Sequence, residues 1–410
     1  MEPTQRRTTC AIVGGGPAGM VLGLLLARAG VAVTVLEKHA DFLRDFRGDT
    51  VHPTTMRLLD ELGLWQRFAA LPFSEIHRGE IESGGRTATL VDFTRLRRQP
   101  HPFIAMVPQW DLLTLLADAA ADEPTFTLLM QAEVTGLLTD NERINGVRYE
   151  TPSGPAELRA DLTVACDGRW SVVRRASGLR SREFPVNFDV WWFRLPRTGS
   201  VPPTLVPRLA PGRVALLIPR RDYYQVAYLG QKGTDAAVRR RGIEDFRRGV
   251  AELIPADVGD VAALTSMDDV KHLDVRVNRL RRWHREGLLC IGDAAHAMSP
   301  VGGVGINLAV QDAVAAAAVL AGPLLRGGVR GRHLAAVRRR RMAATAVTQT
   351  VQRGMHRLLD RALRGDAFTP PPWVMRLLSV APWLAGIPAY FVGVGVRPEH
   401  APGFARRVER

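Results

Sequence analysis

The hydrophobic pattern predicts alternating strands and helices in the first part of the chain. Apolar runs at residues 11–13 and 31–36 flank a glycine-rich turn and an apolar helix, which is the order of a βαβ unit. Helical spacing recurs at residues 50–65 and 110–121, and strand-like runs lie at residues 126–138, 143–149 and 162–166. This part of the chain is therefore predicted to be α/β.

The pattern changes near residue 184 and becomes mostly β up to residue 275. Strand-like runs lie at residues 188–195, 213–218 and 224–229, and residues 75–104 alternate like a hairpin around Gly84-Gly85. An apolar strand at residues 288–291 then leads through glycines into an alanine-rich helix, and a long basic helix is expected at residues 332–364. We expect a second, sheet-based domain inserted into the first.

The tail contains an apolar stretch, residues 377–396, in which no side chain is charged. Its length meets that of a membrane span, but Pro382, Pro388 and several glycines interrupt a helix. A helical hairpin packed on the protein, a homodimer contact and a peripheral membrane contact remain as alternatives.

Length and composition indicate the number of domains, the type of partner and the cellular compartment. The 410 residues suggest two domains with a C-terminal appendage, and the 46% apolar content permits a sizeable core. The net charge of +14, almost all arginine, indicates solvated faces or attraction to an anionic partner such as a nicotinamide dinucleotide phosphate or a membrane surface. No nucleic-acid-binding module is recognisable. Scattered Cys10, Cys166 and Cys290 and the lack of an apolar signal core favour the cytoplasm, and no metal site is expected.

Three glycines and one acid give the first βαβ unit its chemistry. Gly14 allows a tight turn out of the strand, Gly16 lets backbone N–H groups approach a pyrophosphate, and Gly19 lets the helix pack closely on the strand. The helix N-terminus attracts phosphate, and Glu37 can accept hydrogen bonds from ribose hydroxyls. This spacing predicts a dinucleotide-binding site.

Two further motifs follow apolar strands. The first is Asp167-Gly168-Arg169-Trp170-Ser171, and the second runs from Gly292-Asp293 through Pro300 and a glycine-rich bend to Asn307. With the first glycine loop, and in this order, they resemble the single-component FAD-dependent aromatic hydroxylases of the p-hydroxybenzoate hydroxylase type. The resemblance covers roughly residues 8–320.

The resemblance implies a set of site residues around FAD. Glu37 would bind the adenosine ribose, Asp293 a ribityl hydroxyl, and Gly305-Ile306 the flavin pyrimidine. The complete implied cofactor set is Gly14, Gly16, Pro17, Ala18, Gly19, Glu37, Lys38, Arg47, Gln109, Val134, Asp167, Gly168, Asp293, Gly305, Ile306 and Asn307. Pro300, Gly303 and His296 are the candidate catalytic residues, although a structural hydrogen-bonding role is favoured for His296.

The implied fold is a Rossmann-like FAD-binding domain, a parallel sheet with helices, that carries an inserted, mainly β substrate domain and a helical C-terminal segment. We expect the FAD-binding domain at residues 1–74, 105–180 and 276–330. The substrate domain would occupy residues 75–104 and 181–275, and the helical segment residues 331–410.

The implied activity is an FAD-dependent monooxygenase. NADPH or NADH would reduce FAD, O2 would add at flavin C4a, and the hydroperoxide would place one oxygen atom in an aromatic or other electron-rich small molecule. A phenol-deprotonating base cannot be chosen from sequence, since Tyr223, Tyr224 and Arg213 are better explained as ordinary strand residues. An epoxidase- or reductase-like flavoprotein for an apolar substrate and a non-catalytic flavin-binding redox protein remain alternatives.

Overall fold

The computed structural model describes residues 4–43, 49–83, 86–197, 204–210, 212–220, 222–254, 258–365, 376–378 and 380–407. Its largest element is a twisted sheet, which we call the first sheet, whose described strands run in the order β19-β20-β11-β1-β2-β8. A β9–β10 hairpin extends it through β11. These strands are β1 (Thr4–Val13), β2 (Val33–Leu36), β8 (Phe126–Leu129), β9 (Glu133–Asp140), β10 (Arg143–Thr151), β11 (Gly154–Ala165), β19 (His284–Arg285) and β20 (Leu288–Cys290).

The central strands of the first sheet are mutually parallel, and their carboxyl ends therefore meet at one edge. β1 pairs in parallel with β2 and β11, and β11 pairs in parallel with β20. The residues that follow β1, β2, β11 and β20 are the glycine turn, Glu37, the Asp167 motif and the Asp293 motif. Ligands of open parallel sheets bind beyond such an edge.

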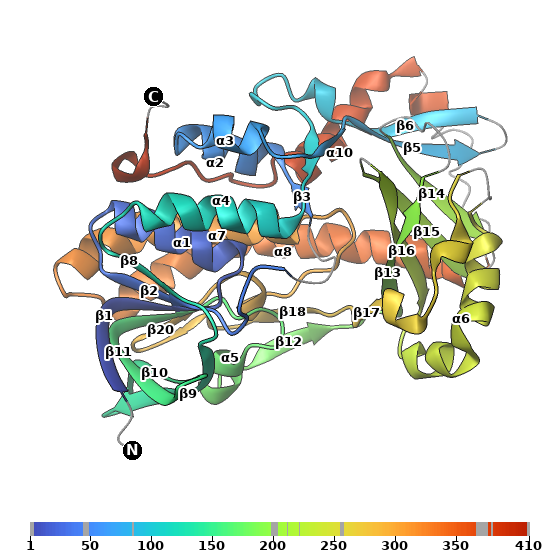
Figure 1. Ribbon diagram of the computed structural model, residues 1–410. Helices are drawn as coiled ribbons and strands as arrows, with labels where there is room; N and C mark the ends of the chain where they lie inside the picture. The colour runs from blue at the N-terminus through green and yellow to red at the C-terminus, as the bar shows by residue number, and fades with distance from the viewer. Residues whose placement is uncertain are drawn as a thin grey trace.

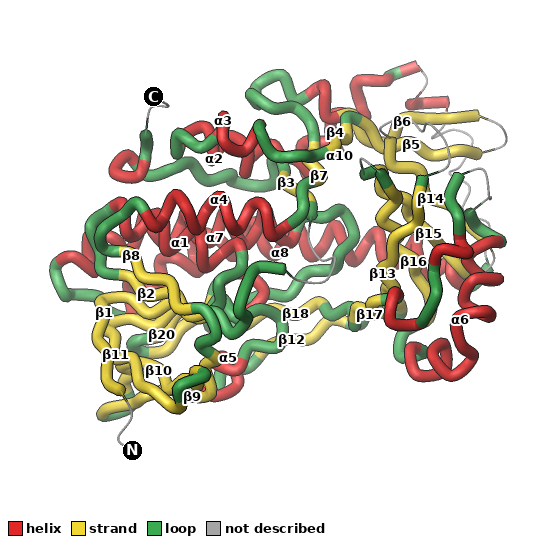
Figure 2. Tube along the Cα trace, in the orientation of Figure 1, coloured by secondary structure: helices red, strands yellow, loops and turns green. Residues whose placement is uncertain are grey.

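A layer of helices covers the first sheet, as Figures 1 and 2 show. Helix α1 (Pro17–Arg28) packs against α4 (Gln109–Ala121) and α7 (Gly305–Leu325), and α7 packs in turn on α8 (Gly331–Leu363). The described residues contain one helix long and apolar enough to span a membrane, α7, and 67% of its apolar window is buried, as in the core helix of a globular protein.

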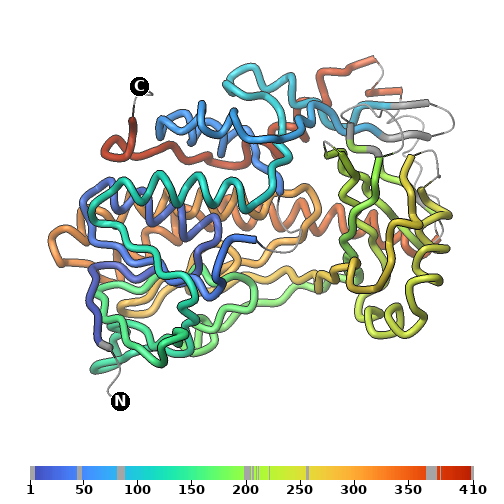
Figure 3. Tube along the Cα trace, in the orientation of Figure 1, coloured from blue at the N-terminus to red at the C-terminus, as the bar shows by residue number. Residues whose placement is uncertain are grey.

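The second sheet follows the described strand order β17-β13-β16-β15-β14-β5-β6 and joins segments that are far apart in sequence (Figure 3). Helix α6 (Asp235–Ala251) covers one of its faces, through Phe246 and Val250. Its strands are β5 (Arg78–Ser83), β6 (Arg86–Asp92), β13 (Phe188–Pro196), β14 (Thr204–Ala210), β15 (Arg213–Pro219), β16 (Tyr223–Gln231) and β17 (Lys271–Leu273).

Smaller elements connect the two sheets. The antiparallel pair β12 (Ser181–Phe184) and β18 (Val277–Leu280) runs between them (Figure 1), and β3 (Thr50–Val51) and β4 (Ser74–Ile76) both pair with β7 (Ile104–Met106). The short helices are α2 (Pro53–Glu61), α3 (Trp65–Ala69), α5 (Val172–Ala176) and, in the tail, α10 (Gly386–Gly393).

Three expectations for individual elements need correction. Residues 50–65 contain a two-residue strand, α2 and the start of α3 rather than one helix, because Pro53 begins α2 and Gly63, with φ 68°, follows its end. The run 126–138 contains two strands, β8 and β9, because the chain turns at Gln131, whose φ is 52°. The mainly β segment also contains the arginine-rich helix α6, which hydrophobic alternation does not indicate.

Candidate active site

The first glycine turn has the geometry that the sequence predicts. Gly14 has φ 103°, and a Cβ built there would lie 2.6 Å from the carbonyl oxygen of Cys166. A Cβ on Gly19 would lie 2.0 Å from the carbonyl oxygen of Gly14. Both positions therefore exclude any side chain, because α1 and β11 approach the turn so closely.

Gly16 differs from its neighbours, because a Cβ built there would meet no atom within 4 Å. Its φ of −77° is ordinary for any residue, so neither the fold nor the backbone requires glycine at this position. It is the N-cap residue of α1, and Pro17 and Ala18 begin the helix beside this open space. Open space at a helix N-terminus fits the diphosphate of a bound dinucleotide.

Glu37 lies at the carboxyl end of β2, beside the glycine turn. Its Oε2 accepts a hydrogen bond from the backbone N–H of Gly15 at 2.8 Å, and its Oε1 accepts one from the N–H of His39 at 3.1 Å. The carboxylate is buried whereas Lys38 is exposed. Because a carboxylate has further lone pairs, Glu37 can still accept from a ribose hydroxyl.

The second and third motifs converge at the same edge. Arg169 Nη2 lies 3.4 Å from Asp293 Oδ2, and Arg174 donates to the carbonyl oxygen of Ala294 at 3.0 Å. Asp167 Oδ2 accepts from the N–H of Val173 at 3.1 Å, but its Oδ1 is buried without a hydrogen-bond partner. Burial raises the pKa of Asp167, although its hydrogen bonds oppose this effect. An orphaned buried oxygen next to Gly168 fits a ligand that donates to it.

The glycine-rich bend ends at the N-terminus of α7. Gly303 has φ 64°, and its carbonyl oxygen accepts from Thr50 Oγ1 at 2.8 Å and faces His52 Nε2 at 2.9 Å. Gly305 and Ile306 begin α7, where backbone N–H groups have no partner within the helix. Asn307 is held from α2, because its Oδ1 accepts from the hydroxyls of Thr54 and Thr55. The bend, with half-buried Pro300, thus presents donors and a positive helix end.

His296 is a buried residue of the third motif. Its Nε2 lies 2.5 Å from Asp312 Oδ2, and its ring is 5.0 Å from that of Trp283. Asp312 also accepts from the N–H of Gly292 at 3.1 Å and pairs with Arg341 Nε at 3.0 Å. His296 thus contacts Asp312, which also binds the start of the Asp293 loop, and the structural role favoured for His296 remains a prediction.

The remaining candidates lie in three different settings. Gln109 begins α4 and is half-buried, and Val134 is a buried residue of β9 opposite Tyr149. Arg47 falls outside the described residues. The cofactor contacts of these three residues remain predictions.

Sequence reasoning missed the polar residues on the inner face of the second sheet, the face that packs against Val301 of the glycine bend. Trp192 lies on this face, and its indole Nε1 is buried without a hydrogen-bond partner. Gln225 pairs in register with Arg194 and Ile218, and paired residues point to the same face of a sheet. The residues next to them along each strand face α6, so Gln225 lies on the inner face. Of the earlier candidates Tyr223 shares this inner face, whereas Tyr224 packs on the α6 side and Arg213 pairs with Glu252, which follows α6.

Arg220 follows β15 and joins the second sheet to the segment before β3. Its Nη2 lies 2.5 Å from Asp49 Oδ2 and 2.5 Å from Gln225 Oε1, but its Nη1 is buried without a partner. Burial raises the pKa of Asp49 and lowers that of Arg220, and their attraction opposes both shifts. A buried cation with a free donor is suited to hold an oxygen of a bound molecule.

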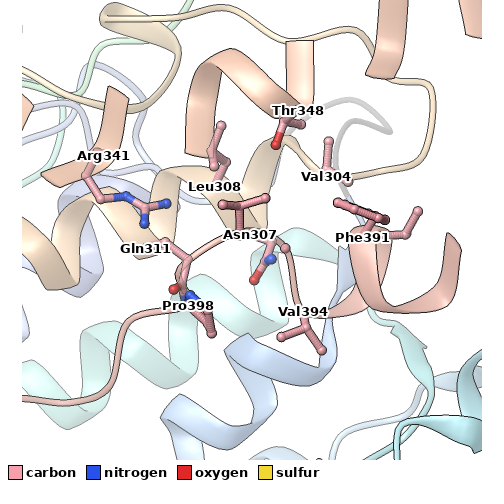
Figure 4. Close-up of a pocket in the computed structure, with 12 residues that line it drawn as sticks. Val304, Asn307, Leu308, Gln311, Arg341, Thr348, Phe391, Val394 and Pro398 are labelled. Carbon is pink, nitrogen blue, oxygen red and sulfur yellow. The ribbon is translucent and has the colours of Figure 1, made fainter. Parts of the chain in front are cut away.

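A separate cavity lies near the N-terminus of α7, between α7, α8 and the tail (Figure 4). Its volume is about 20 Å³, and Asn307, Gln311, Arg341 and Phe391 are among its lining residues. This space suits about one water molecule and is too small for an aromatic substrate. This cavity is therefore not a candidate substrate site.

Replacing Asp293 by alanine is expected to weaken flavin binding at least about tenfold, because one or two charge-assisted hydrogen bonds are lost. The ratio of flavin to protein absorbance after gel filtration measures the retained flavin. Asp293→Asn, which keeps an acceptor of the same shape, should retain more. Unchanged flavin content in Asp293→Ala would refute the assignment of this carboxylate to the cofactor.

Comparison with known proteins identifies the family. The family described as FAD binding domain matches residues 7–351. The chain is 36% identical to 6-methylpretetramide 4-monooxygenase of Streptomyces rimosus, over 92% of this chain and 90% of that protein. Among solved structures, the anhydrotetracycline hydroxylase OxyS of Streptomyces rimosus matches with a TM-score of 0.76 at 26% identity, over 95% of this chain and 76% of that chain.

CabE, an aromatic hydroxylase from angucycline biosynthesis, matches with a TM-score of 0.75 at 25% identity, over 94% of this chain and 76% of that one. The converging motifs, the open position at Gly16 and the orphaned oxygen of Asp167 fit the same cofactor. The chain therefore belongs to the FAD-dependent aromatic hydroxylases, and it is an FAD-dependent monooxygenase.

Proposed function

We propose that this monooxygenase hydroxylates a fused polycyclic phenol that lies between the glycine bend and the inner face of the second sheet. The observation that carries the proposal is the pair of buried donors without partners on that face, Trp192 Nε1 and Arg220 Nη1. Around them the lining is apolar, with Leu216, Ile218 and Met106 among the packed residues. An extended aromatic molecule with oxygen substituents satisfies both features.

The relatives support this substrate class. Their names refer to 6-methylpretetramide, anhydrotetracycline and angucycline biosynthesis. We propose that the substrate is an aromatic compound of related ring structure and that NADPH or NADH supplies the electrons. The domain boundaries expected from the sequence remain part of this proposal.

Bound FAD would supply the oxygen-transfer chemistry, and the chain's own residues would position it and the substrate. The N-terminus of α7 places its positive end beside the glycine bend, where it favours negative charge on a bound ring system. Arg220 and Trp192 would each hold a substrate oxygen, and a nearby guanidinium favours the phenolate form of a phenol. The apolar lining would exclude water from the reaction.

Location and assembly are further parts of the proposal. Cys10, Cys166 and Cys290 form no disulfide, and burial raises the pKa of the Cys10 thiol to about 12, which fits unreactive thiols in the cytoplasm. Residues 377–396 do not form one long helix among the described residues, yet Val380, Trp383 and Ile387 are exposed there. We propose that this apolar surface makes a peripheral membrane contact or a homodimer contact.

The substrate proposal is tested by incubating the holoenzyme with a panel of polycyclic phenols, NADPH and O2. A product heavier by one oxygen atom, formed with coupled NADPH oxidation, is expected for members of this class. Oxidation of NADPH with only peroxide output for every phenol tested would reject the substrate class. Monocyclic phenols serve as the comparison class in the same assay.

Replacing Trp192 by phenylalanine is expected to raise KM for the polycyclic substrate about tenfold, because one hydrogen bond inside a desolvated site is lost. The matched control is Tyr224→Phe, which removes a polar group without a partner from the opposite face of the same sheet. The control should leave KM unchanged. Equal KM values for Trp192→Phe and Tyr224→Phe would show that the substrate does not bind at the inner face of the second sheet.

A further inference from the structure

Three arginines, Arg182, Arg279 and Arg353, surround Phe184 of β12, and the charge of Arg338, earlier on α8, also acts on Arg279. We call these four residues the arginine cluster. The guanidinium carbons of Arg182, Arg279 and Arg353 lie 5.2, 5.6 and 5.0 Å from the ring centroid of Phe184. Three positive charges therefore surround one aromatic ring. Each cation is attracted to the ring, but the three cations repel one another.

The strand register makes this repulsion direct. Arg182 and Arg279 are opposite each other in the antiparallel β12–β18 pair, an arrangement that is destabilising for like charges. The pKa of Arg279 is lowered first by burial and then by the charges of Arg182, Arg353 and Arg338. Repulsion between these arginines therefore destabilises this part of the fold, and a negative charge bound among them would reduce the repulsion.

Among the residues that the structure describes, no carboxylate forms an ion pair with the arginine cluster. The carboxylates on adjoining elements keep their charge but hydrogen-bond to neutral donors instead, and Asp360 Oδ1 has no hydrogen-bond partner. Glu183 accepts from Ser181, Asp360 accepts from Asn187, and Glu286 accepts from the N–H of Gly331. The positive charges of the cluster are thus left for a ligand to neutralise.

Buried nitrogens without partners give a second sign of a ligand. Arg338 Nε is buried without a hydrogen-bond partner, and so is the neighbouring His284 Nδ1. Burial, followed by the charges of Arg282 and Arg338, lowers the pKa of His284, so this ring adds no positive charge at neutral pH. A guanidinium N–H without an acceptor is unfavourable in a buried position, and an anion bound there would remove that penalty.

We propose that the arginine cluster binds phosphate groups, and that these belong to the phosphorylated nicotinamide dinucleotide. Guanidinium groups present planar pairs of donors that match phosphate oxygens. Arg182 and Arg279 lie on β12 and β18. β12 follows the Asp167 motif and β18 precedes the Asp293 motif, so these two arginines are close in sequence to both cofactor loops. The assignment of the dinucleotide rests on the proposed function, whereas phosphate binding does not.

The test compares the wild-type holoenzyme with the double variant Arg182→Gln/Arg279→Gln. Calorimetric titration with pyrophosphate measures the site without any turnover, and steady-state kinetics then give KM for NADPH and for NADH. The matched control is Arg241→Gln/Arg248→Gln, which removes the same charge from α6, where both arginines pair with Asp245.

We expect pyrophosphate to bind the wild type and the control, and to bind the double variant at least about tenfold more weakly. KM for NADPH should rise by a similar factor, and KM for NADH should rise less. Lost pyrophosphate binding with unchanged KM for NADPH would support the phosphate site and overturn the dinucleotide as its ligand. A wild type that binds no pyrophosphate, or a double variant that binds it equally well, would overturn the site itself.

Discussion

Asp312→Ala is expected to lower the free energy of unfolding by about 3–5 kcal/mol, because it removes the closer of the two carboxylates that pair with a buried cation. Asp312 is completely buried in α7, and its two oxygens bind His296 and Arg341. Arg341 is 1% exposed and also lies 3.6 Å from Glu399 in the tail. Urea unfolding followed by circular dichroism measures the loss.

Flavin content should fall in the same variant, because Asp312 also accepts from the N–H of Gly292, directly before Asp293. The control is Asp245→Ala, a half-buried partner of Arg241 and Arg248 on α6, for which a change within about 0.5 kcal/mol is expected. Comparable effects of the two substitutions would show that the buried pair makes no special contribution to stability.

The same carboxylate predicts a pH dependence. Burial alone would raise the pKa of Asp312, but His296 and Arg341 outweigh it and hold the pKa below the ordinary 3.8. A carboxylate whose pKa is depressed by folding stabilises the native state above its unfolded pKa and loses that contribution as the pH falls through the folded value. The stability difference between wild type and Asp312→Asn should therefore shrink as the pH falls below about 4.

Much of the first sheet could be predicted, because its signals are local. Glycines at positions that exclude a Cβ, such as Gly14 and Gly19, can be recognised in the sequence. Strands that are buried on both faces can also be recognised, because they form continuous apolar runs. Helix α6 could not be predicted in this way. It carries few apolar residues, of which Phe246 and Val250 are buried, and Gly242 interrupts it with φ 83°.

The positions of candidate site residues could be predicted where each residue directly follows a strand. Glu37, Asp167 and Asp293 follow strands, and parallel pairing alone brings them to one edge. The contact of Arg169 with Asp293 depends on how β11 and β20 pair, which a single sequence does not reveal. The substrate face depends on register, since a shift of one residue would exchange Tyr224 for Gln225 on the inner face.

Gly16→Ala is expected to weaken FAD binding at least about tenfold while leaving the stability of the flavin-free protein unchanged, because its Cβ enters space that only the cofactor would fill. Gly19→Ala is the matched comparison, made on the same loop with the same added methyl group. Its Cβ would lie 2.0 Å from the carbonyl oxygen of Gly14, so α1 must move and both stability and flavin binding should fall.

Thermal unfolding of the flavin-free proteins and fluorescence titration with FAD separate the two effects. Full FAD affinity in Gly16→Ala would mean that no diphosphate lies against this helix end. Loss of stability in Gly16→Ala would mean instead that its glycine is structural, like Gly19. The contrast between the two glycines thus tests the cofactor site apart from the fold, because only one of the two added methyl groups meets protein atoms.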